Sequence, residues 1–350
     1  MTAATQRHDN NFDLLRMLFA YAVVFTHVRE LSGGTSEFFL FSSSGWGVDG
    51  FFLISGFLVF RSWQNQPHFG AYGLKRLFRI YPAYITVIAV QCAILVALQW
   101  DDIRIPEVLR YLAANALFLN FLAPTVGDIF AELPFNAANG ALWTLKIEVA
   151  FYVLMPAAVI VARRFLPIIL LIAIIVSFAY YVTLLDLEQT RLANQLPGKT
   201  RLFALGMLLA IYGHRIPIWA YAIAAVAALG ALQLGTTGFL SIDIAIRDLL
   251  LAAGIMAVAF ATPHPPLPTD ISFAVYLVHF PLIQLALVAG LASTIPAWAF
   301  LLAVLAAATL LALALALLVE RPMLAIGTAW ARAAGQAGAT LIHDRTFRAP

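Results

Sequence analysis

Long apolar runs follow one another along the chain, and the short segments between them hold most of the polar residues. A helix that crosses a bilayer needs about 20 mostly apolar residues. The pattern therefore predicts an all-α polytopic membrane protein, a bundle of about ten transmembrane helices, of which the sixth is short. Their approximate bounds are 12–31, 46–64, 80–100, 142–162, 166–186, 201–213, 216–234, 247–263, 271–291 and 297–319.

Two further stretches differ from these spans. Residues 108–124 are apolar but brief and contain an arginine and two asparagines, so we expect an interfacial or re-entrant helix there. The residues after the last span are compatible with an amphipathic interfacial helix. We therefore expect a single transmembrane domain over 1–322, followed by a cytoplasmic or interfacial tail over 323–350.

The composition agrees with a membrane protein. Of the 350 residues, 62% are hydrophobic and 11% are charged, whereas about a quarter of the residues in soluble domains are charged. The single cysteine, Cys92, excludes an internal disulfide framework and a multi-cysteine metal site. The histidines outside the candidate spans have no metal-ligand spacing with one another, so we expect no metal.

The distribution of charge predicts a topology. The formal net charge is +3, and cytoplasmic loops of membrane proteins carry an excess of Lys and Arg. With the N-terminus inside, thirteen of the 21 basic residues fall on the cytoplasmic side and twelve of the 18 acidic residues on the other. We expect both termini in the cytoplasm, a multi-pass protein of the cytoplasmic (inner) membrane, and no nucleic-acid partner.

The first candidate span carries polar residues on one face. Arg16 and His27 are eleven residues apart, and eleven steps of about 100° return to within about 20° of the starting direction. Asp13 precedes Arg16 by three residues and shares that face. Ionisable residues inside membranes are functional candidates because their insertion is costly. We expect a buried His27 to be neutral and free to accept a proton; a structural contact with a neighbouring helix is the alternative.

Three later segments add polar residues at or inside the spans. Asp49 lies near the outer end of the second span, where it is either a site residue or an interfacial charge. Arg76 and Arg79 face the same way at a cytoplasmic helix end, which suits a phosphate ligand but also a positive-inside anchor. Glu148 shares a helix face with Tyr152 and needs a partner, such as an arginine or histidine of another helix, in a functional or a purely structural pair.

The last two spans also carry ionisable residues. His279 lies in the ninth span with Tyr276 on the same face. Glu320 and Arg321 close the tenth span, where Pro322 predicts that the helix ends.

Six segments carry recognisable motifs. The stretch "FDLLRMLFAYAVVFTH" contains D-x-L-R and a later histidine, and "GVDGFFLISGFL" contains G-V-D-x-F-F-x-x-S-G-F. "RLFRIYPAY", "LWTLKIEVAFY", "YLVHFP" and "VERP" follow in order. Together, from Asp13 to Pro322, these segments resemble the acyltransferase-3 family of integral membrane acyltransferases. Gly50 stands where a large apolar residue is common in that family, and Val149 where a second acid is frequent.

The resemblance implies transfer of an acyl group, usually acetyl, from cytoplasmic acyl-CoA to a sugar hydroxyl. The acceptor would be a surface glycan, a lipid-linked glycan or a secreted metabolite, and acetyl-CoA would be a co-substrate rather than a permanently bound cofactor. His27 would act as general base or accept the acyl group itself. Arg16 would stabilise the thioester oxyanion or hold a phosphate, and Glu148 would orient a partner, with Arg16 as one possibility.

The same hypothesis assigns the remaining candidates. Arg76 and Arg79 would hold the CoA phosphates, with Tyr81 beside them. The residues assigned to substrate binding or support are Asp13, Asp49, Ser55, Trp143, Tyr152, Tyr276, His279, Glu320 and Arg321.

Two other classes of function are open. A transporter or flippase would also use intramembrane His, Glu and Arg, and an inverted repeat, which we do not find, would support it. A structural assembly subunit does not explain why Arg16 and His27 share a face. Release of CoA from a thioester would separate an enzyme from both.

Overall fold

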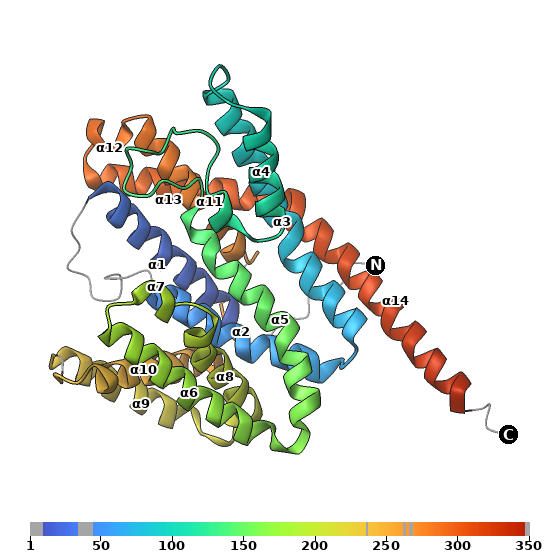
Figure 1. Cartoon of the computed structure of the whole chain (residues 1–350). Helices are drawn as coiled ribbons and strands as arrows, with labels where there is room; N and C mark the ends of the chain where they lie inside the picture. The colour runs from blue at the N-terminus through green and yellow to red at the C-terminus, as the bar shows by residue number, and fades with distance from the viewer. Residues whose placement is uncertain (1–9, 34–44, 236, 262–263, 266–268, 347–350) are drawn as a thin grey trace. The chain divides into compact units, whose positions relative to one another are not determined.

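The computed structural model describes residues 10–33, 45–235, 237–261, 264–265 and 269–346, and these residues form helices and connecting segments with no strand (Figure 1). The α-helices are α1 (Phe12–Ser32), α2 (Gly45–Asn65), α3 (Phe69–Leu98), α4 (Ile105–Ala116), α5 (Trp143–Ala162), α6 (Leu166–Asp186), α7 (Thr190–Ala193), α8 (Leu196–Tyr212), α9 (Ile218–Gln233), α10 (Leu240–Phe260), α11 (Ser272–Val288), α12 (Leu291–Thr294), α13 (Ala297–Leu315) and α14 (Arg321–Thr346). Short helical turns are η2 (Asn120–Leu122), η3 (Gly140–Leu142), η4 (Arg163–Phe165), η5 (Gly213–Arg215) and the π-helix η6 (Ala316–Glu320). The all-α prediction is confirmed for the described residues.

The chain divides into two compact units. The boundary between the units falls within three helices, α1, α2 and α5, so each of these helices belongs partly to unit 1 and partly to unit 2. Unit 1 consists of Met1–Phe19, Gly45–Arg61 and Ala157–Asp270. Unit 2 consists of Ala20–Ser44, Ser62–Pro156 and Ile271–Pro350.

In unit 1, glycines allow close helix packing. Gly56 of α2 lies against the backbone of Phe203 in α8, and Gly206 of α8 lies against the backbone of α2, so a Cβ at either position would overlap the opposing chain. Small residues at interfaces commonly serve this purpose in membrane helices. The ring of Phe19 occupies the space that a side chain at Gly50 would need, which explains why a large residue is absent there.

The ends of α1 and α10 are joined within the same unit. Nδ2 of Asn11 donates to the carbonyl oxygens of Val258 and Ala261, each at 2.9 Å. Carbonyls in the last turn of a helix lack the usual partner within the helix, and these hydrogen bonds add an acceptor contact at both groups. Elsewhere in the unit, α9 packs against α10 and α6 against α8.

In unit 2, the segment before α5 is attached to α11. Nε2 of Gln284 donates to the carbonyls of Phe135 and Ala137 at 2.6 and 2.8 Å, and Nδ2 of Asn139 donates to the carbonyl of Leu277 at 2.9 Å. These hydrogen bonds fix the position at which α5 begins. In the same unit α3 packs along α14, and α11 packs against α13 (Figure 1).

Most expected spans agree with the helices to within a few residues. Three expected starts were wrong, because α3 begins at Phe69 rather than 80, α8 at Leu196 rather than 201, and α10 at Leu240 rather than 247. The early turns of these helices contain charged and polar residues. Such residues lower the local hydropathy but do not prevent a helix from forming. Residues 262 and 263, at the end of the eighth expected span, lie outside the described residues.

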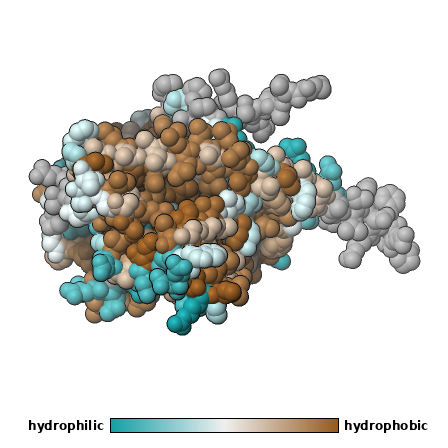
Figure 2. Space-filling model, turned by 90° about the horizontal axis from the view of Figure 1, so that it is seen from above, coloured by the Kyte–Doolittle hydropathy of each residue, from teal (hydrophilic) through white to brown (hydrophobic). Residues whose placement is uncertain are grey.

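Among the described residues, three helical stretches are long and apolar enough to cross a membrane by length and composition. They are Phe69–Leu98, Gly140–Asp186, which contains α5 and α6, and Ala297–Gln336; Ile218–Gln233 and Ser272–Val288 are shorter apolar helices. Apolar residues cover much of the surface in Figure 2. On α6, for example, Ile168, Leu171 and Ile175 are 58%, 53% and 60% exposed. Such a surface is typical of helices that face lipid.

The stretch 108–124 forms a short helix, as expected. Helix α4 has 12 residues, which is too few to cross a bilayer. It is followed by Phe118, whose φ of 60° takes the chain out of the helical conformation and whose ring stacks on Tyr84 at a centroid distance of 4.4 Å.

The expectation that Pro322 ends the last span was wrong. The chain continues from α13 through the π-helix η6 into α14, where Arg321 and Pro322 occupy the first turn. Proline lacks an N–H and is tolerated in the first turn of a helix, and the π-turn re-sets the hydrogen-bond register before it. The tail is therefore helical to Thr346, and residues 347–350 lie outside the described residues.

Candidate active site

The two histidines selected from the sequence meet in unit 2. His27 lies on α1 and His279 on α11, and Nδ1 of His27 is 2.9 Å from Nε2 of His279. The ring planes are 7° from parallel, with centroids 5.1 Å apart. His279 is fully buried, and His27 is half-buried. Among the described residues, no group of three or more His, Cys, Asp and Glu side chains could hold a metal ion.

The hydrogen bonds of this pair define the tautomers. Nδ1 of His279 is 3.0 Å from the carbonyl oxygen of Val275, which can only accept, so this nitrogen carries a proton. In a neutral His279 the other nitrogen, Nε2, is then an acceptor, and Nδ1–H of His27 must donate to it. Nε2 of a neutral His27 therefore keeps its lone pair. No described residue makes a hydrogen bond to that Nε2.

Aromatic side chains surround the pair. The ring of Phe280 lies edge-on to His27, with a centroid distance of 5.3 Å and an interplanar angle of 82°. The hydroxyl of Tyr276 is 2.6 Å from both the carbonyl oxygen of Ala141 and Oγ1 of Thr144. Because the carbonyl accepts the only tyrosine proton, Thr144 donates to Tyr276. Tyr276 therefore links α11 to the start of α5, close to the histidines.

A second group of polar side chains surrounds Arg76 of α3. Its guanidinium carbon Cζ lies 5.7 Å from the ring centroid of Tyr72 and 5.5 Å from that of Tyr152, and Nη2 donates to Ser62 Oγ at 3.0 Å. The Tyr152 hydroxyl donates to Oε1 of Glu148 at 2.5 Å. Nε of Arg76 is buried and has no hydrogen-bond partner among the described residues.

The structure thus adds Arg76 to Glu148 and Tyr152, which were expected to share a helix face. Glu148 was expected to find an arginine or a histidine from another helix. Oε1 of Glu148 accepts a hydrogen bond from Tyr152 on its own helix, and Arg76 of another helix, α3, lies over that tyrosine ring. Arg16, named as one possible partner of Glu148, forms its ion pair elsewhere.

The other candidates of unit 2 lie at known positions along its helices. Arg79 is half-buried one turn after Arg76, and Tyr81 packs edge-on against the aromatic ring that follows α4. Trp143 is half-buried at the first position of α5. Glu320 is buried at the end of η6, and Arg321 is exposed at the start of α14.

In unit 1, Arg16 pairs with an acid that sequence reasoning missed. Nη1 of Arg16 is 2.6 Å from Oδ2 of Asp270 and 3.7 Å from Oδ1 of Asp13. Asp270 lies in the connection before α11, outside the apolar runs, so hydropathy gave no signal for it. Ser55, another candidate, is half-buried on α2.

Asp49 is also in unit 1, and the interpretation of it as an interfacial charge was wrong. Its side chain is fully buried and contacts Lys199, Arg201 and Arg247. Sequence reasoning missed these three cations and Asp248. Basic residues at the start of an apolar helix, as in α8, were the available signal.

Comparisons with known proteins found a matching family model and several relatives. The family model described as an acyltransferase domain matches residues 9–317. Nodulation protein 10 of Rhizobium leguminosarum bv. viciae is 28% identical over 307 residues, which cover 78% of this chain and 82% of that protein. The exopolysaccharide production protein ExoZ of Rhizobium meliloti (strain 1021) is 29% identical over a stretch that covers 83% of this chain and 93% of that protein. An O-acetyl transferase of Shigella phage Sf6 is 32% identical over 43% of this chain and 46% of its own length. No solved structure matches this chain.

Proposed function

This chain belongs to the acyltransferase-3 family, and we propose that it is a membrane O-acyltransferase that moves an acyl group, which we take to be acetyl, from cytoplasmic acyl-CoA to a sugar hydroxyl. The acceptor is a surface glycan, a lipid-linked glycan or a secreted metabolite. Relatives named for O-acetyl transfer and for exopolysaccharide production support this assignment. The proposal includes a multi-pass topology of about ten spans in the inner membrane, with both termini in the cytoplasm.

The observation that carries the proposal is the free lone pair on Nε2 of His27. In the proposed reaction, this nitrogen takes the proton of the acceptor hydroxyl while the hydroxyl oxygen attacks the thioester carbonyl carbon. The carbon–sulfur bond then breaks, and the imidazolium returns the proton to the leaving CoA sulfur, so that an ester and a free thiol result. His279 holds the His27 ring by accepting from Nδ1–H. Direct acylation of His27 followed by transfer to the acceptor is the alternative order.

The group around Arg76 supports a role in binding CoA. Two tyrosine rings lie beside the guanidinium, and its Nε lacks an acceptor among the described residues. An arginine held in this way suits a phosphate, which offers several acceptor oxygens to the planar fork. Arg79, one turn further along α3, adds a second positive charge, and Glu148 orients the Tyr152 hydroxyl.

Arg16 of unit 1 is proposed to hold a phosphate of the acyl donor or to stabilise the thioester oxyanion. The ion pair with Asp270, at 2.6 Å, holds its guanidinium in place.

The test is release of free CoA thiol from acetyl-CoA by the purified protein in detergent or liposomes. We expect slow release even without an acceptor, because water can replace the hydroxyl. Binding of acetyl-CoA without any release would require an acceptor screen before the proposal stands. Movement of labelled acetyl-CoA across the liposome membrane without thiol release would instead support the transporter alternative.

A further inference from the structure

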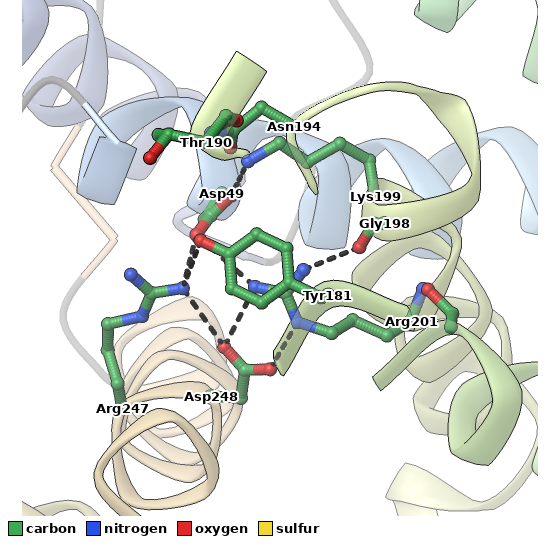
Figure 3. Close-up of polar contacts among 10 residues, drawn as sticks. Asp49, Tyr181, Thr190, Asn194, Gly198, Lys199, Arg201, Arg247 and Asp248 are labelled. Atoms are coloured by element: carbon green, nitrogen blue, oxygen red, sulfur yellow. Dashed lines mark hydrogen bonds and ion pairs between the residues drawn. The ribbon is translucent and has the colours of Figure 1, made fainter. Parts of the chain in front are cut away.

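Five charged side chains pack together in unit 1, around the ring of a tyrosine on α6 (Figure 3). Asp49 comes from α2, Lys199 and Arg201 from α8, and Arg247 and Asp248 from α10. We call these five residues the Asp49 cluster. The side chains of Asp49 and Lys199 are each 1% exposed, whereas that of Arg247 is 21% exposed.

The two carboxylates of the Asp49 cluster are fully engaged. Oδ1 of Asp49 accepts from Nζ of Lys199 at 2.5 Å, and its Oδ2 lies 2.9 Å from Nη2 of Arg247 and 3.6 Å from Nη2 of Arg201. Asp248 accepts from Nε of Arg201 at 2.7 Å. Neither acid has a free oxygen with which to neutralise another cation.

The Asp49 cluster has more positive than negative charge. Three cations face two carboxylates, which leaves one positive charge without a counter-ion inside the cluster. Removing a charge from water is costly unless it is paired and hydrogen-bonded. An excess cation in such a position therefore calls for an explanation other than stability.

Arg247 is the cation of the cluster that has unused donors. Arg201 uses all three of its nitrogens, since Nε and Nη2 face Asp248 and Nη1 donates to the carbonyl of Gly198. The hydrogen bonds and ion pairs of Arg247 instead all run through Nη2, as the dashed lines in Figure 3 show. Its Nε is buried without an acceptor among the described residues. Arg247 therefore has donors to spare at the most exposed point of the cluster.

Two aromatic rings lie beside this guanidinium. Its Cζ is 5.8 Å from the ring centroid of Trp46, in the first turn of α2, and 5.8 Å from that of Tyr181. The flat apolar face of an indole stacks on sugar rings, and a guanidinium binds carboxylates and phosphates through paired hydrogen bonds. Together they match a sugar that carries an acidic group.

We propose that Trp46 and Arg247 form an acceptor subsite that binds an anionic sugar, with the ring on the indole and its carboxylate or phosphate on the guanidinium. This inference rests on the proposed function and adds the chemical class of the acceptor. On the proposed topology the contributing ends of α2, α6, α8 and α10 lie on the outer side, where a surface glycan would be met.

The test uses purified full-length protein in a neutral detergent without anionic lipid. The melting temperature is measured against sodium glucuronate and glucose 1-phosphate, with glucose plus sodium chloride at equal ionic strength as the neutral control. We expect a saturable rise with at least one anionic sugar and none with glucose. Arg247→Gln and Trp46→Ala should abolish the rise. Arg191→Gln, which changes an exposed arginine of α7 in the same unit, should keep it.

Trp46→Ala keeps all five charges, so loss of the shift in that variant cannot come from an unbalanced cluster. An equal rise in Arg247→Gln, or no rise in the wild type, would overturn the subsite. A rise that only phosphatidylglycerol micelles produce would assign the cation to a lipid headgroup and would also overturn it. CoA release and acetyl-CoA binding by the same wild-type preparation test the proposed function separately. Release without an Arg247-dependent shift overturns only the subsite. An Arg247-dependent shift in a protein that neither binds acetyl-CoA nor releases CoA overturns acyl transfer and leaves an anionic-sugar site without an acceptor role.

Discussion

Nδ1 of His27 and Nε2 of His279 lie 2.9 Å apart, although 252 positions separate them in the sequence. The carbonyl of Val275 fixes the proton of His279 on Nδ1. Nε2 of His279 is then the acceptor, and Nδ1–H of His27 is the donor, in the hydrogen bond between the two rings. We therefore propose that His279 is a positioning residue and that Nε2 of His27 is the basic nitrogen.

A first prediction concerns the role of His279. We expect His279→Leu to lower kcat for acetyl transfer and to leave KM for acetyl-CoA unchanged, because the His27 ring loses the acceptor that orients it. His279→Gln restores an acceptor oxygen and should recover part of kcat. An equal loss of kcat in both variants, or a change in KM alone, would show that His279 acts only in packing.

Arg76 should act on donor binding rather than on chemistry. Arg76→Gln is expected to raise KM for acetyl-CoA about tenfold, equivalent to about 1.4 kcal/mol, with little change in kcat. Lys75→Gln is the matched control, because Lys75 is the adjacent cation and donates to Gln66 rather than to the tyrosine group. An equal rise of KM in Lys75→Gln would show that the effect comes from the loss of one positive charge and not from the position of Arg76.

Close packing of α2 and α8 can be tested with two glycines of unit 1. Gly56→Ala should lower the melting temperature in detergent and destabilise the fold by about 1–3 kcal/mol, because the new Cβ meets the backbone of Phe203. Gly254→Ala on α10 places its Cβ in open space and should be neutral or stabilising. Similar melting temperatures for the two variants would contradict the close approach.

Asp49 should be essential for stability because it contacts all three cations of its cluster. Asp49→Asn leaves three cations with one carboxylate and should destabilise the protein by roughly 3–5 kcal/mol, as expected for a broken buried ion pair. Folded yield and melting temperature in detergent measure the effect. Asp186→Asn, at the exposed end of α6, should change neither. A stable Asp49→Asn protein would mean that the cluster is solvated.

The proposed topology can be mapped with single cysteines in a Cys92→Ala background. Asp101→Cys lies on the side predicted to be outside, and Arg164→Cys on the side predicted to be inside; both positions are exposed. A membrane-impermeant maleimide added to right-side-out vesicles should label position 101 and not position 164. Labelling of both, or of 164 alone, would require a different number of spans between them or the opposite orientation.

Much of the fold follows from hydropathy alone. Helices α1, α2, α5, α6 and α13 start within one residue of the expected spans, because each apolar run is flanked by polar residues. The charged beginnings of α3, α8 and α10 were missed. Charged residues lower the local hydropathy and so predict a loop, unless the residues that pair with them are known. Arg247, for example, is tolerated within α10 because Asp49 of α2 pairs with it.

The candidate site shows the same limit. Sequence reasoning selected His27, His279 and Glu148 as costly groups in apolar surroundings, and Arg76 as a cation at a helix end. It could not pair His27 with His279 or Arg76 with Tyr152, since these contacts join different helices. It missed Asp270, because a carboxylate in a connecting segment looks solvated until Arg16 is seen beside it. Geometry between helices, rather than residue type, is the missing information.

The most direct measurement of the central claim compares CoA release from acetyl-CoA by the wild type, His27→Ala and His214→Ala. His214 is an exposed histidine of η5, so its variant controls for the loss of any imidazole. We expect His27→Ala to remain folded and inserted but to lose the activity, by about 10²–10⁴-fold if His27 is a general base, while His214→Ala releases CoA like the wild type. Release by His27→Ala at the wild-type rate would contradict the assignment of His27 as base or acyl acceptor.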